Sequence, residues 1–288
     1  MKVVITGANG QLGRCLQDRL GGSEHDVVSM SRNDLDITDS RAVLERMAAV
    51  KPDVIINAAA YTAVDKAETD RETAWAVNAN AVENLASAAN TVEARLIHVS
   101  TDYVFDGASS RPYREVDPVN PTSVYGASKF AGEKAAEKAG RHVIVRTAWV
   151  FSEYGNNFLK TMVRLAGERE RLSIVNDQTG SPTYAGDLAN ALIRLCEVTP
   201  ENGVYHFSGG DACTWFDFAS AIFATCGQLP SEFVVPRVNP VPSSEFPTAA
   251  SRPAFSVFDG GKLWQKAAVS SGDWRRALDS VCRKVLFV

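Results

Sequence analysis

The feature that most constrains the fold of this chain is a glycine-rich turn that begins at residue 7. The turn, Gly7-Ala8-Asn9-Gly10-Gln11-Leu12-Gly13, follows the β-branched run Lys2–Thr6, and residues 15–20 continue with helical periodicity. Glycines let backbone N–H groups approach a diphosphate closely, and a helix N-terminus behind them favours its negative charge. The order strand, glycine turn, helix therefore predicts a dinucleotide-binding fold, although a glycine turn can also be only a tight connection.

Strand-like and helix-like segments alternate along the first half of the chain. Further strands are predicted at residues 27–29, 54–56, 96–99 and 142–146, and helices at about 40–49, up to 89, and from about Ser123 onward. Asp39 and Ser40 are both good N-caps for the first of these helices. The alternation predicts an α/β protein with a doubly wound parallel (Rossmann) sheet.

The pattern becomes less regular after Phe151. We predict a dinucleotide-binding domain over residues 1–151. Residues 152–288 then form a mixed segment, with strands that return to the sheet and a smaller C-terminal substrate-binding lobe. A helix at about 158–167 and the proline-rich stretch 230–253 belong to that lobe.

Composition narrows the classes of partner. The 288 residues are 45% hydrophobic, which is enough for a packed core, and the net charge of −4 gives no basic surface for nucleic acid. No apolar run approaches the roughly 20 residues of a membrane-spanning helix, and the N-terminus reaches glycine too early for a signal peptide. We expect a cytoplasmic protein without nucleic-acid or membrane partners.

Cysteine and histidine usage predicts no metal site. The five cysteines (Cys15, Cys196, Cys213, Cys226, Cys282) are odd in number and never form Cys-x-x-Cys, which is typical of reduced, buried thiols. The four histidines (His25, His98, His142, His206) are scattered without metal-ligand spacing.

Tyr125-Gly126-Ala127-Ser128-Lys129 is the strongest candidate for catalysis. A Tyr and a Lys four apart on a helix project from one face. A neighbouring ammonium favours the phenolate and lowers the pKa of the phenol, so that Tyr125 could transfer protons near neutral pH. The alternative is a half-buried Tyr beside a solvated Lys. Thr101, at the end of the predicted strand 96–99, is the natural third member of a catalytic group.

The end of the second predicted strand bears on the choice of coenzyme. In such folds an acid there binds ribose hydroxyls, whereas a base accepts a 2′-phosphate. Ser31-Arg32 stands at this end, which favours NADPH and leaves NADH possible; the alternative is an exposed loop arginine. Asp36 and Ile37 could bracket the adenine.

The segment after the third predicted strand is small and apolar. Asn57-Ala58-Ala59-Ala60-Tyr61-Thr62 could pass over the cofactor or could serve only tight packing of a helix on the sheet. Asn78 is open to the same two interpretations.

The glycine spacing G-x-x-G-x-x-G is a form used by the short-chain dehydrogenase/reductase superfamily. Beyond it, nearly the whole chain resembles the dTDP-4-dehydrorhamnose reductase family of the extended short-chain dehydrogenase/reductases. The resemblance lies in residues 7–13, 57–68, 100–105, 125–129, 146–150, 155–158, 177–183 and 252–253.

This resemblance implies that NADPH, or less readily NADH, gives hydride to C4 of dTDP-4-dehydro-L-rhamnose, a nucleotide-sugar substrate. It implies a Tyr125 that protonates the C4 oxygen, a Lys129 that binds the nicotinamide ribose and tunes Tyr125, and a Thr101 that orients the carbonyl. The implied cofactor contacts are Gly10, Gln11, Leu12, Asp36, Ile37, Ala60, Tyr61, Thr62 and Val99. The implied substrate contacts are Asp102, Trp149, Asn157, Phe158 and Arg252; Trp149 and Phe158 could instead be core aromatics.

The chain departs from the family pattern in two places. Phe255 stands where an Asn is usual, which bears on the edge of the substrate site. Some family members bind magnesium through acids at a dimer interface, and here Cys15 replaces the first acid while Gly186, beside Asp187, aligns with another. Magnesium prefers hard oxygen ligands. We therefore expect no bound Mg²⁺ and a monomer or weak homodimer.

Two other functions are compatible with the same resemblance. One is a sugar-nucleotide epimerase that retains NAD. Arg32 argues against this function, because a basic residue at the end of the second predicted strand favours NADP over NAD. The other is a non-enzymatic NADP-binding regulatory subunit, which the intact Thr101, Tyr125 and Lys129 disfavour.

Overall fold

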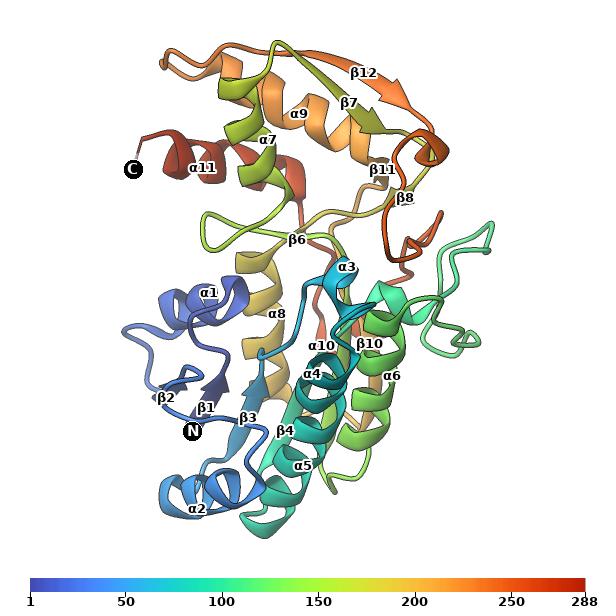
Figure 1. Ribbon diagram of the computed structural model, residues 1–288. Coiled ribbons are helices and arrows are strands. Elements are labelled where there is room, and N and C mark those ends of the chain that lie inside the picture. Colours follow the sequence, from blue (N-terminus) through green and yellow to red (C-terminus); the bar gives the residue numbers. More distant parts are fainter. Residues whose placement is uncertain (288) are drawn as a thin grey trace.

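A six-stranded parallel sheet forms the centre of the molecule, in the order β10-β5-β4-β3-β1-β2 (Figure 1). The computed structural model describes residues 1–287. The strands are β1 (Lys2–Thr6), β2 (Asp26–Met30), β3 (Val54–Asn57), β4 (Arg95–Thr101), β5 (His142–Thr147) and β10 (Gly203–His206). The predicted doubly wound parallel sheet is confirmed, and each predicted strand lies within an observed one.

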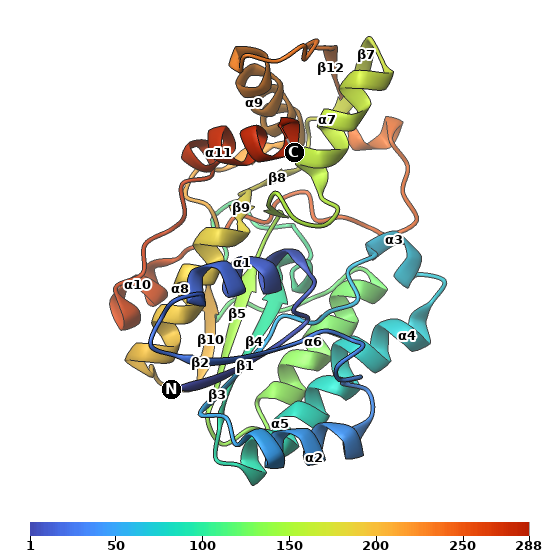
Figure 2. The ribbon, with the colours of Figure 1, turned by 90° about the vertical axis from the view of Figure 1, so that its left-hand side faces the viewer.

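Helices cover both faces of the sheet (Figure 2). One face carries α1 (Gln11–Leu20), α8 (Ala185–Val198) and α10 (Gly261–Ala267), whose buried side chains include Leu16, Leu192 and Leu263. The other carries α2 (Ser40–Val50), α5 (Ala81–Thr91) and α6 (Val124–Ala136), which bury Met47, Leu85 and Ala136. Because both faces are covered, the strands are continuous apolar runs, as parallel sheets require.

Side-chain caps fix where two of these helices begin. The Asp39 carboxylate accepts hydrogen bonds from the backbone N–H groups of Arg41 and Ala42, each at 3.0 Å. Asp39, rather than Ser40, is therefore the N-cap of α2. Ser123 accepts from the N–H of Gly126 at 3.1 Å and starts α6 at the predicted place.

The crossover from β3 to β4 is irregular. It contains α3 (Val64–Ala67), α4 (Arg71–Trp75) and a π-helix (Ala76–Asn80) before α5. The π-helix packs on α6 at Gly132, where a Cβ would lie 2.0 Å from the Asn78 carbonyl oxygen. Only glycine permits this close approach between the crossover and α6.

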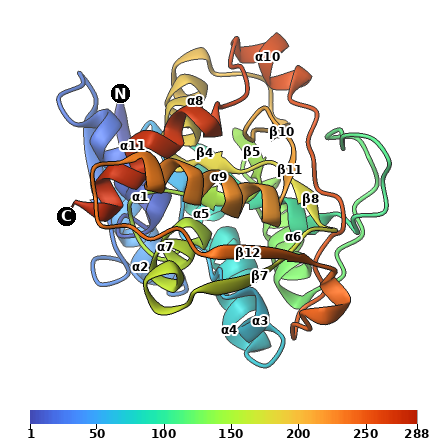
Figure 3. The same ribbon diagram turned by 90° about the horizontal axis from the view of Figure 1, so that it is seen from above.

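A smaller lobe lies above the carboxyl ends of the strands (Figure 1), and it lies in front of the sheet when the molecule is seen from above (Figure 3). Its core joins α7 (Phe158–Glu168), α9 (Trp215–Gln228) and α11 (Trp274–Leu286) with β7 (Arg171–Val175), which pairs in parallel with β12 (Arg237–Val241). Short pairs also join β6 (Val150–Phe151) to β9 (Thr183–Tyr184) and β8 (Thr179–Gly180) to β11 (Cys213–Thr214). Short 3-10 helices occupy Asp102–Val104 and Ser243–Glu245.

The lobe is not one continuous stretch of sequence. The chain leaves it at α8, crosses the sheet face, adds β10 to the sheet edge and then returns to α9. No helix among residues 1–287 is both long enough and apolar enough to cross a membrane.

Candidate active site

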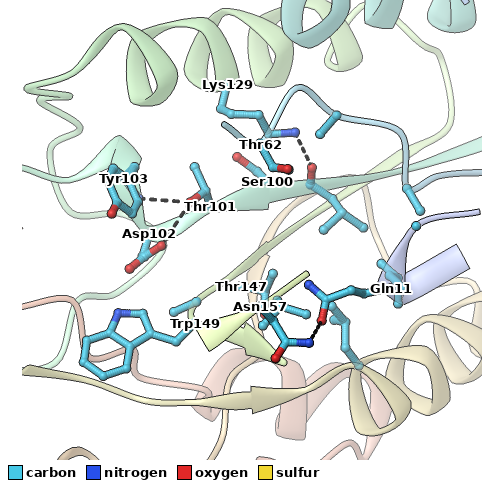
Figure 4. A pocket seen from close by; sticks show the side chains of 18 of the residues that line it. Gln11, Thr62, Ser100, Thr101, Asp102, Tyr103, Lys129, Thr147, Trp149 and Asn157 are labelled. Atoms are coloured by element: carbon cyan, nitrogen blue, oxygen red, sulfur yellow. Dashed lines mark hydrogen bonds between the residues drawn. The ribbon is translucent and has the colours of Figure 1, made fainter. Parts of the chain in front are cut away.

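A cleft of about 520 Å³ lies between the carboxyl edge of the sheet and the lobe (Figure 4). Residues that follow β1, β3, β4 and β5 line it, as expected for ligand sites of doubly wound folds. A second hollow of about 440 Å³ shares Gly10 and residues 58–60 with the first. The two hollows form one elongated groove across the sheet edge.

The glycine turn is packed tightly against the end of β3. Gly7 has φ +71°, and a Cβ there would lie 2.6 Å from the Ala59 backbone nitrogen. A Cβ at Gly13 would lie 2.3 Å from the Gly7 carbonyl oxygen, so Gly13 seats α1 against the turn and does not itself line the groove. Gly10, Gln11 and Leu12 do line it. Backbone N–H groups at the start of α1 therefore face the groove, and this cradle fits a diphosphate.

The far end of the groove contains the residues predicted for the adenosine. Arg32, Asp36, Ile37, Ala60 and Tyr61 line it. The Asp36 carboxylate accepts hydrogen bonds from the Thr38 hydroxyl at 2.7 Å and its N–H at 3.0 Å, and these bonds lower the pKa of Asp36. The crossover adds four residues that the sequence alone did not single out: Lys66, Asp70, Thr73 and Val77.

Asn78 holds the loop beside this groove. Its side chain accepts from the Tyr61 N–H at 2.8 Å and donates to the Tyr61 carbonyl at 3.1 Å and to the Ser128 hydroxyl at 3.0 Å. Asn78 is 1% exposed. Of the two interpretations left open, the structure gives Asn78 a packing role: it ties the loop after β3 to α6.

Thr101, Tyr125 and Lys129 meet in the first of the two hollows, the cleft of about 520 Å³. Thr101 ends β4, whereas Tyr125 and Lys129 lie on one face of α6, and all three are buried. The Lys129 ammonium donates to the Val99 carbonyl at 2.6 Å, and the Thr101 hydroxyl donates to the Asp102 carboxylate at 3.0 Å. Figure 4 shows Lys129 and Thr101 approaching the groove from the same side.

The pKa of Tyr125 differs from the sequence-based expectation. Burial raises it to about 12, and the Thr101 hydroxyl opposes this only in part. The expected lowering by Lys129 is therefore wrong for the protein alone, because burial dominates and the ammonium bonds to Val99. Burial also lowers the pKa of Lys129 to about 8. At neutral pH the group thus combines a protonated phenol with a charged ammonium.

Trp149 is the aromatic side chain on the lobe-facing wall of the cleft. Trp149 adopts φ +49°, a left-handed conformation that is uncommon for a non-glycine residue. Its ring stacks on Trp215 with centroids 3.4 Å apart, and a Cβ at Gly180 would lie 2.5 Å from Trp149 Cε2. Trp149 is thus held by residues of the lobe. We did not predict a role for Trp215 from the sequence, because no local pattern connects it with Trp149, which is distant in the chain.

Asn157 connects the lobe to the glycine turn. Its side-chain nitrogen donates to the side-chain Oε1 of Gln11 at 2.9 Å, while its side-chain oxygen caps α7 by accepting from the Lys160 N–H at 3.0 Å. Both Gln11 and Asn157 line the cleft (Figure 4). Of the other residues predicted to line the cleft, Thr62, Val99, Asp102 and Trp149 do so.

Two predicted substrate residues lie outside the lining of the cleft. The half-buried Phe158 packs against the lobe core, with its ring centroid 4.6 Å from that of Trp215 and 5.6 Å from that of Phe218. Arg252 forms two hydrogen bonds with the Asp65 carboxylate, at 2.7 and 3.1 Å. Direct substrate contact by Phe158 or Arg252 stays a prediction, and the structure gives each a structural partner instead.

Asp102 and Tyr103 complete the lining beside Thr101. Burial raises the pKa of the Asp102 carboxyl to about 6, and the hydroxyls of Ser256 and Thr101 oppose the rise. Tyr103 packs edge-on against Tyr125 with ring centroids 5.4 Å apart. Tyr103 was not predicted as a site residue; its position next to Asp102 is the sequence signal that could have identified it. Phe255, which precedes Ser256, packs near Tyr113.

The positions at which the family resemblance implies metal-binding acids do not offer a hard oxygen cage. Cys15 is buried in the core between α1 and α8, and burial raises its pKa to about 12. At Gly186, a Cβ would lie 2.4 Å from the Tyr184 ring. Asp187 lies against Gly272, with Arg19 and Arg276 nearby. Among residues 1–287 there is no group of three His, Cys, Asp or Glu that could hold a metal ion.

Comparison with known proteins agrees with this geometry. The family model described as the RmlD substrate binding domain matches residues 1–287. A dTDP-4-dehydrorhamnose reductase of Aggregatibacter actinomycetemcomitans is 44% identical over 287 residues, covering 97% of this chain and 98% of the relative.

Solved structures of dTDP-4-dehydrorhamnose reductases are similar to this chain over nearly their whole length. A dTDP-4-dehydrorhamnose reductase from Clostridium acetobutylicum superposes with a TM-score of 0.93 at 40% identity, covering 98% of each chain. Another from Bacillus anthracis, in complex with NADP, has a TM-score of 0.92 at 40% identity and covers 97% of this chain and 98% of the other. The chain therefore belongs to the dTDP-4-dehydrorhamnose reductase family of the extended short-chain dehydrogenase/reductases.

Proposed function

We propose that this protein catalyses the NADPH-dependent reduction of the C4 keto group of dTDP-4-dehydro-L-rhamnose to dTDP-L-rhamnose, in cell-surface polysaccharide biosynthesis. The observation that carries the proposal is the meeting of Thr101, Tyr125 and Lys129 in a groove that continues to the glycine turn. The names of the relatives, and the NADP complex of the Bacillus anthracis structure, support the substrate and the coenzyme.

The reaction adds a hydride to C4 and a proton to its oxygen. NADPH, when bound, supplies the hydride. Tyr125 donates the proton, and a pKa of about 12 suits this direction because the phenol is fully protonated at neutral pH. Thr101 lies beside Tyr125. Its hydroxyl would turn from the Asp102 carboxylate to the substrate carbonyl, where it orients and polarises the C=O bond as negative charge develops.

Lys129 acts from behind this pair. Its buried ammonium is held at the Val99 carbonyl, on the side of the groove where the nicotinamide ribose would lie. A positive charge at this place stabilises the phenolate that forms when Tyr125 gives up its proton. Trp149 and Asp102, which line the cleft beyond Thr101, are positioned for the sugar.

The proposed coenzyme contacts divide between the two parts of the groove. Gly10, Gln11 and Leu12 would hold the diphosphate at the start of α1, as helix N-termini do. Arg32 would pair with the 2′-phosphate of NADPH, and Asp36 and Ile37 would flank the adenine. NADH remains a second, weaker coenzyme under this proposal.

The decisive experiment follows NADPH absorbance in the presence of 4-keto-6-deoxy sugar nucleotides. A reductase consumes one coenzyme per substrate and yields the 4-hydroxy sugar nucleotide. A sugar-nucleotide epimerase that retains NAD would change the sugar without net loss of absorbance. A non-enzymatic regulatory subunit would bind coenzyme and leave both absorbance and sugar unchanged. Either of these last two results contradicts the proposal.

A further inference from the structure

The carboxylate of Glu133 joins three elements beneath the catalytic group. Glu133 lies on α6, one turn after Lys129, and is 1% exposed. Its Oε1 accepts from the Ser100 hydroxyl at 2.5 Å and from Arg146 Nε at 2.8 Å, while its Oε2 accepts from Arg146 Nη2 at 2.7 Å. Ser100 on β4 and Arg146 on β5 are register partners in the sheet. One side chain therefore ties α6 to both central strands.

The catalytic residues are divided between the elements that Glu133 joins. Thr101 follows Ser100 on β4, whereas Tyr125 and Lys129 belong to α6. A slide or rotation of α6 would change the gap between the Tyr125 phenol and the Thr101 hydroxyl. We propose that Glu133 is a positioning residue for the reduction, because its carboxylate fixes the register of Tyr125 and Lys129 on α6 against Thr101 on β4. This inference rests on the proposed function.

Packing alone would not require an ion pair here. Removing two charges from water is costly, and apolar residues of similar volume often stabilise a core equally well. A bidentate arginine–carboxylate pair instead supplies directional bonds that fix one geometry. Arg146 is itself oriented, since its guanidinium lies 5.0 Å from the Phe105 ring centroid and 3.5 Å from His206 Nε2.

Glu133 also adds a negative charge near Lys129. Glu133 on α6 and His98 on β4 interact electrostatically with Lys129. The elements packed against α6 also carry Asp102 and Tyr103 after β4, Arg146 on β5 and the neutral Asn78 of the π-helix, and α6 itself carries Tyr125. Burial keeps the pKa of His98 well below its usual value, so that imidazole is neutral. Burial lowers the pKa of Lys129 to about 8, and Glu133 acts against this lowering. Loss of the Glu133 charge should therefore deprotonate Lys129 at a lower pH.

The main test compares Glu133→Gln with Glu133→Asp. The glutamine keeps the length of the side chain but removes the charge, whereas the aspartate keeps the charge but shortens the reach. We expect kcat to fall about tenfold in each, because small displacements of reacting groups are costly. The basic limb of the kcat profile should move to lower pH only in Glu133→Gln. NADPH binding, measured by fluorescence titration, should change less than twofold.

Two further variants complete the set. Ser100→Ala removes one bond to Glu133 without leaving a buried charge unpaired, so it tests the proposal even if Glu133→Gln does not fold. We expect kcat to fall severalfold at unchanged NADPH affinity. Glu137→Gln is the matched control, because Glu137 is the C-cap of α6, one turn after Glu133, pairs with the exposed Lys134 and does not line the groove. It should behave as wild type.

Failure of this inference can be distinguished from failure of the proposed function. If wild type consumes no NADPH with any 4-keto sugar nucleotide, the proposed function fails first. If wild type is active, and the folded variants at Ser100 and Glu133 keep kcat within twofold, Glu133 does not position the reaction. An equal shift of the basic limb in Glu133→Gln and Glu133→Asp would equally overturn it, since the aspartate retains the charge. Thermal unfolding of each variant establishes that it is folded.

Discussion

The two walls of the cleft hold their side chains by different forces. On the sheet wall, Thr101, Tyr125 and Lys129 are fixed by backbone elements and by polar contacts below them, such as the bond from Lys129 to the Val99 carbonyl. On the lobe-facing wall, Trp149 is fixed by the stacked Trp215 ring and by Gly180. The sheet wall is therefore sensitive to charge and register, and the lobe-facing wall to shape and apolar contact.

This difference separates two kinds of kinetic effect. Groups that act only in the transition state lower kcat when they are removed, whereas groups that bind substrate throughout raise KM. We expect changes in the sheet wall to act mainly on kcat and changes in the lobe-facing wall mainly on KM for the nucleotide sugar. The predictions that follow test this division, from the largest effect to the smallest.

Tyr125→Phe should give the largest loss. Removing the proton donor should lower kcat at least 10²-fold, the range expected for a positioned general acid. NADPH affinity should change little, because the ring and its packing on Tyr103 remain. Lys129→Ala should instead damage both kcat and NADPH binding. Stopped-flow turnover and coenzyme titration measure the two effects, and near-normal turnover of Tyr125→Phe would contradict the assignment of the acid.

Trp215→Ala should act on the other wall. Without its stacking partner the Trp149 ring gains freedom, and the loss of one aromatic pair corresponds to roughly a tenfold change. We expect KM for the nucleotide sugar to rise by about this factor, with a smaller fall in kcat and unchanged NADPH affinity. Trp264→Ala is the control, because that ring is 59% exposed on α10. A fall in kcat without a rise in KM would contradict the proposal that the lobe-facing wall acts mainly on KM and the sheet wall mainly on kcat.

The sheet wall was largely predictable from sequence, and the lobe-facing wall was not. In parallel α/β folds the end of each apolar run is a position at the ligand edge, so Thr101 and the glycine turn could be located without the structure. The helix period placed Tyr125 with Lys129. The spacing of residues in the sequence does not show how deeply a side chain is buried, however. We therefore expected Lys129 to lower the pKa of Tyr125, whereas burial raises it.

The side-chain contacts that could not be predicted from the sequence join segments that are distant in the chain. Trp215 reaches Trp149 only because α9 folds over the end of β5, and Arg252 meets Asp65 only because the proline-rich stretch returns to α3. The family resemblance implied substrate contact by Phe158, but the amphipathic α7 packs this half-buried ring against the lobe core. Such pairings depend on the topology of the lobe, which has no repeating sequence pattern.

Arg32→Ala tests the coenzyme end of the sheet wall. Arg32 lines the groove after β2, where a guanidinium can form charge-assisted hydrogen bonds with a 2′-phosphate. We expect its loss to weaken NADPH binding about tenfold, since bonds to a charged group at an exposed site are partly screened. NADH binding should be nearly unchanged. Equal weakening of both coenzymes would make Arg32 an ordinary loop residue.

Magnesium should have the smallest effect, on both walls alike. The position at which the family resemblance implies the first acidic ligand holds Cys15, whose buried thiol keeps its proton because burial raises its pKa to about 12. A protonated thiol is a poor ligand for magnesium, which prefers carboxylate and water oxygens. The proposed chemistry needs only Tyr125 and Thr101 to polarise the carbonyl. We therefore expect turnover to survive EDTA, and sedimentation to show a monomer or weak homodimer that added magnesium does not change.

Restoring an acid with Cys15→Glu would bury a carboxylate in the core beside Leu188 and should destabilise the fold rather than create a site. A magnesium-dependent dimer of the wild-type protein, or activity abolished by EDTA and restored by magnesium, would show that other oxygen ligands compensate for Cys15.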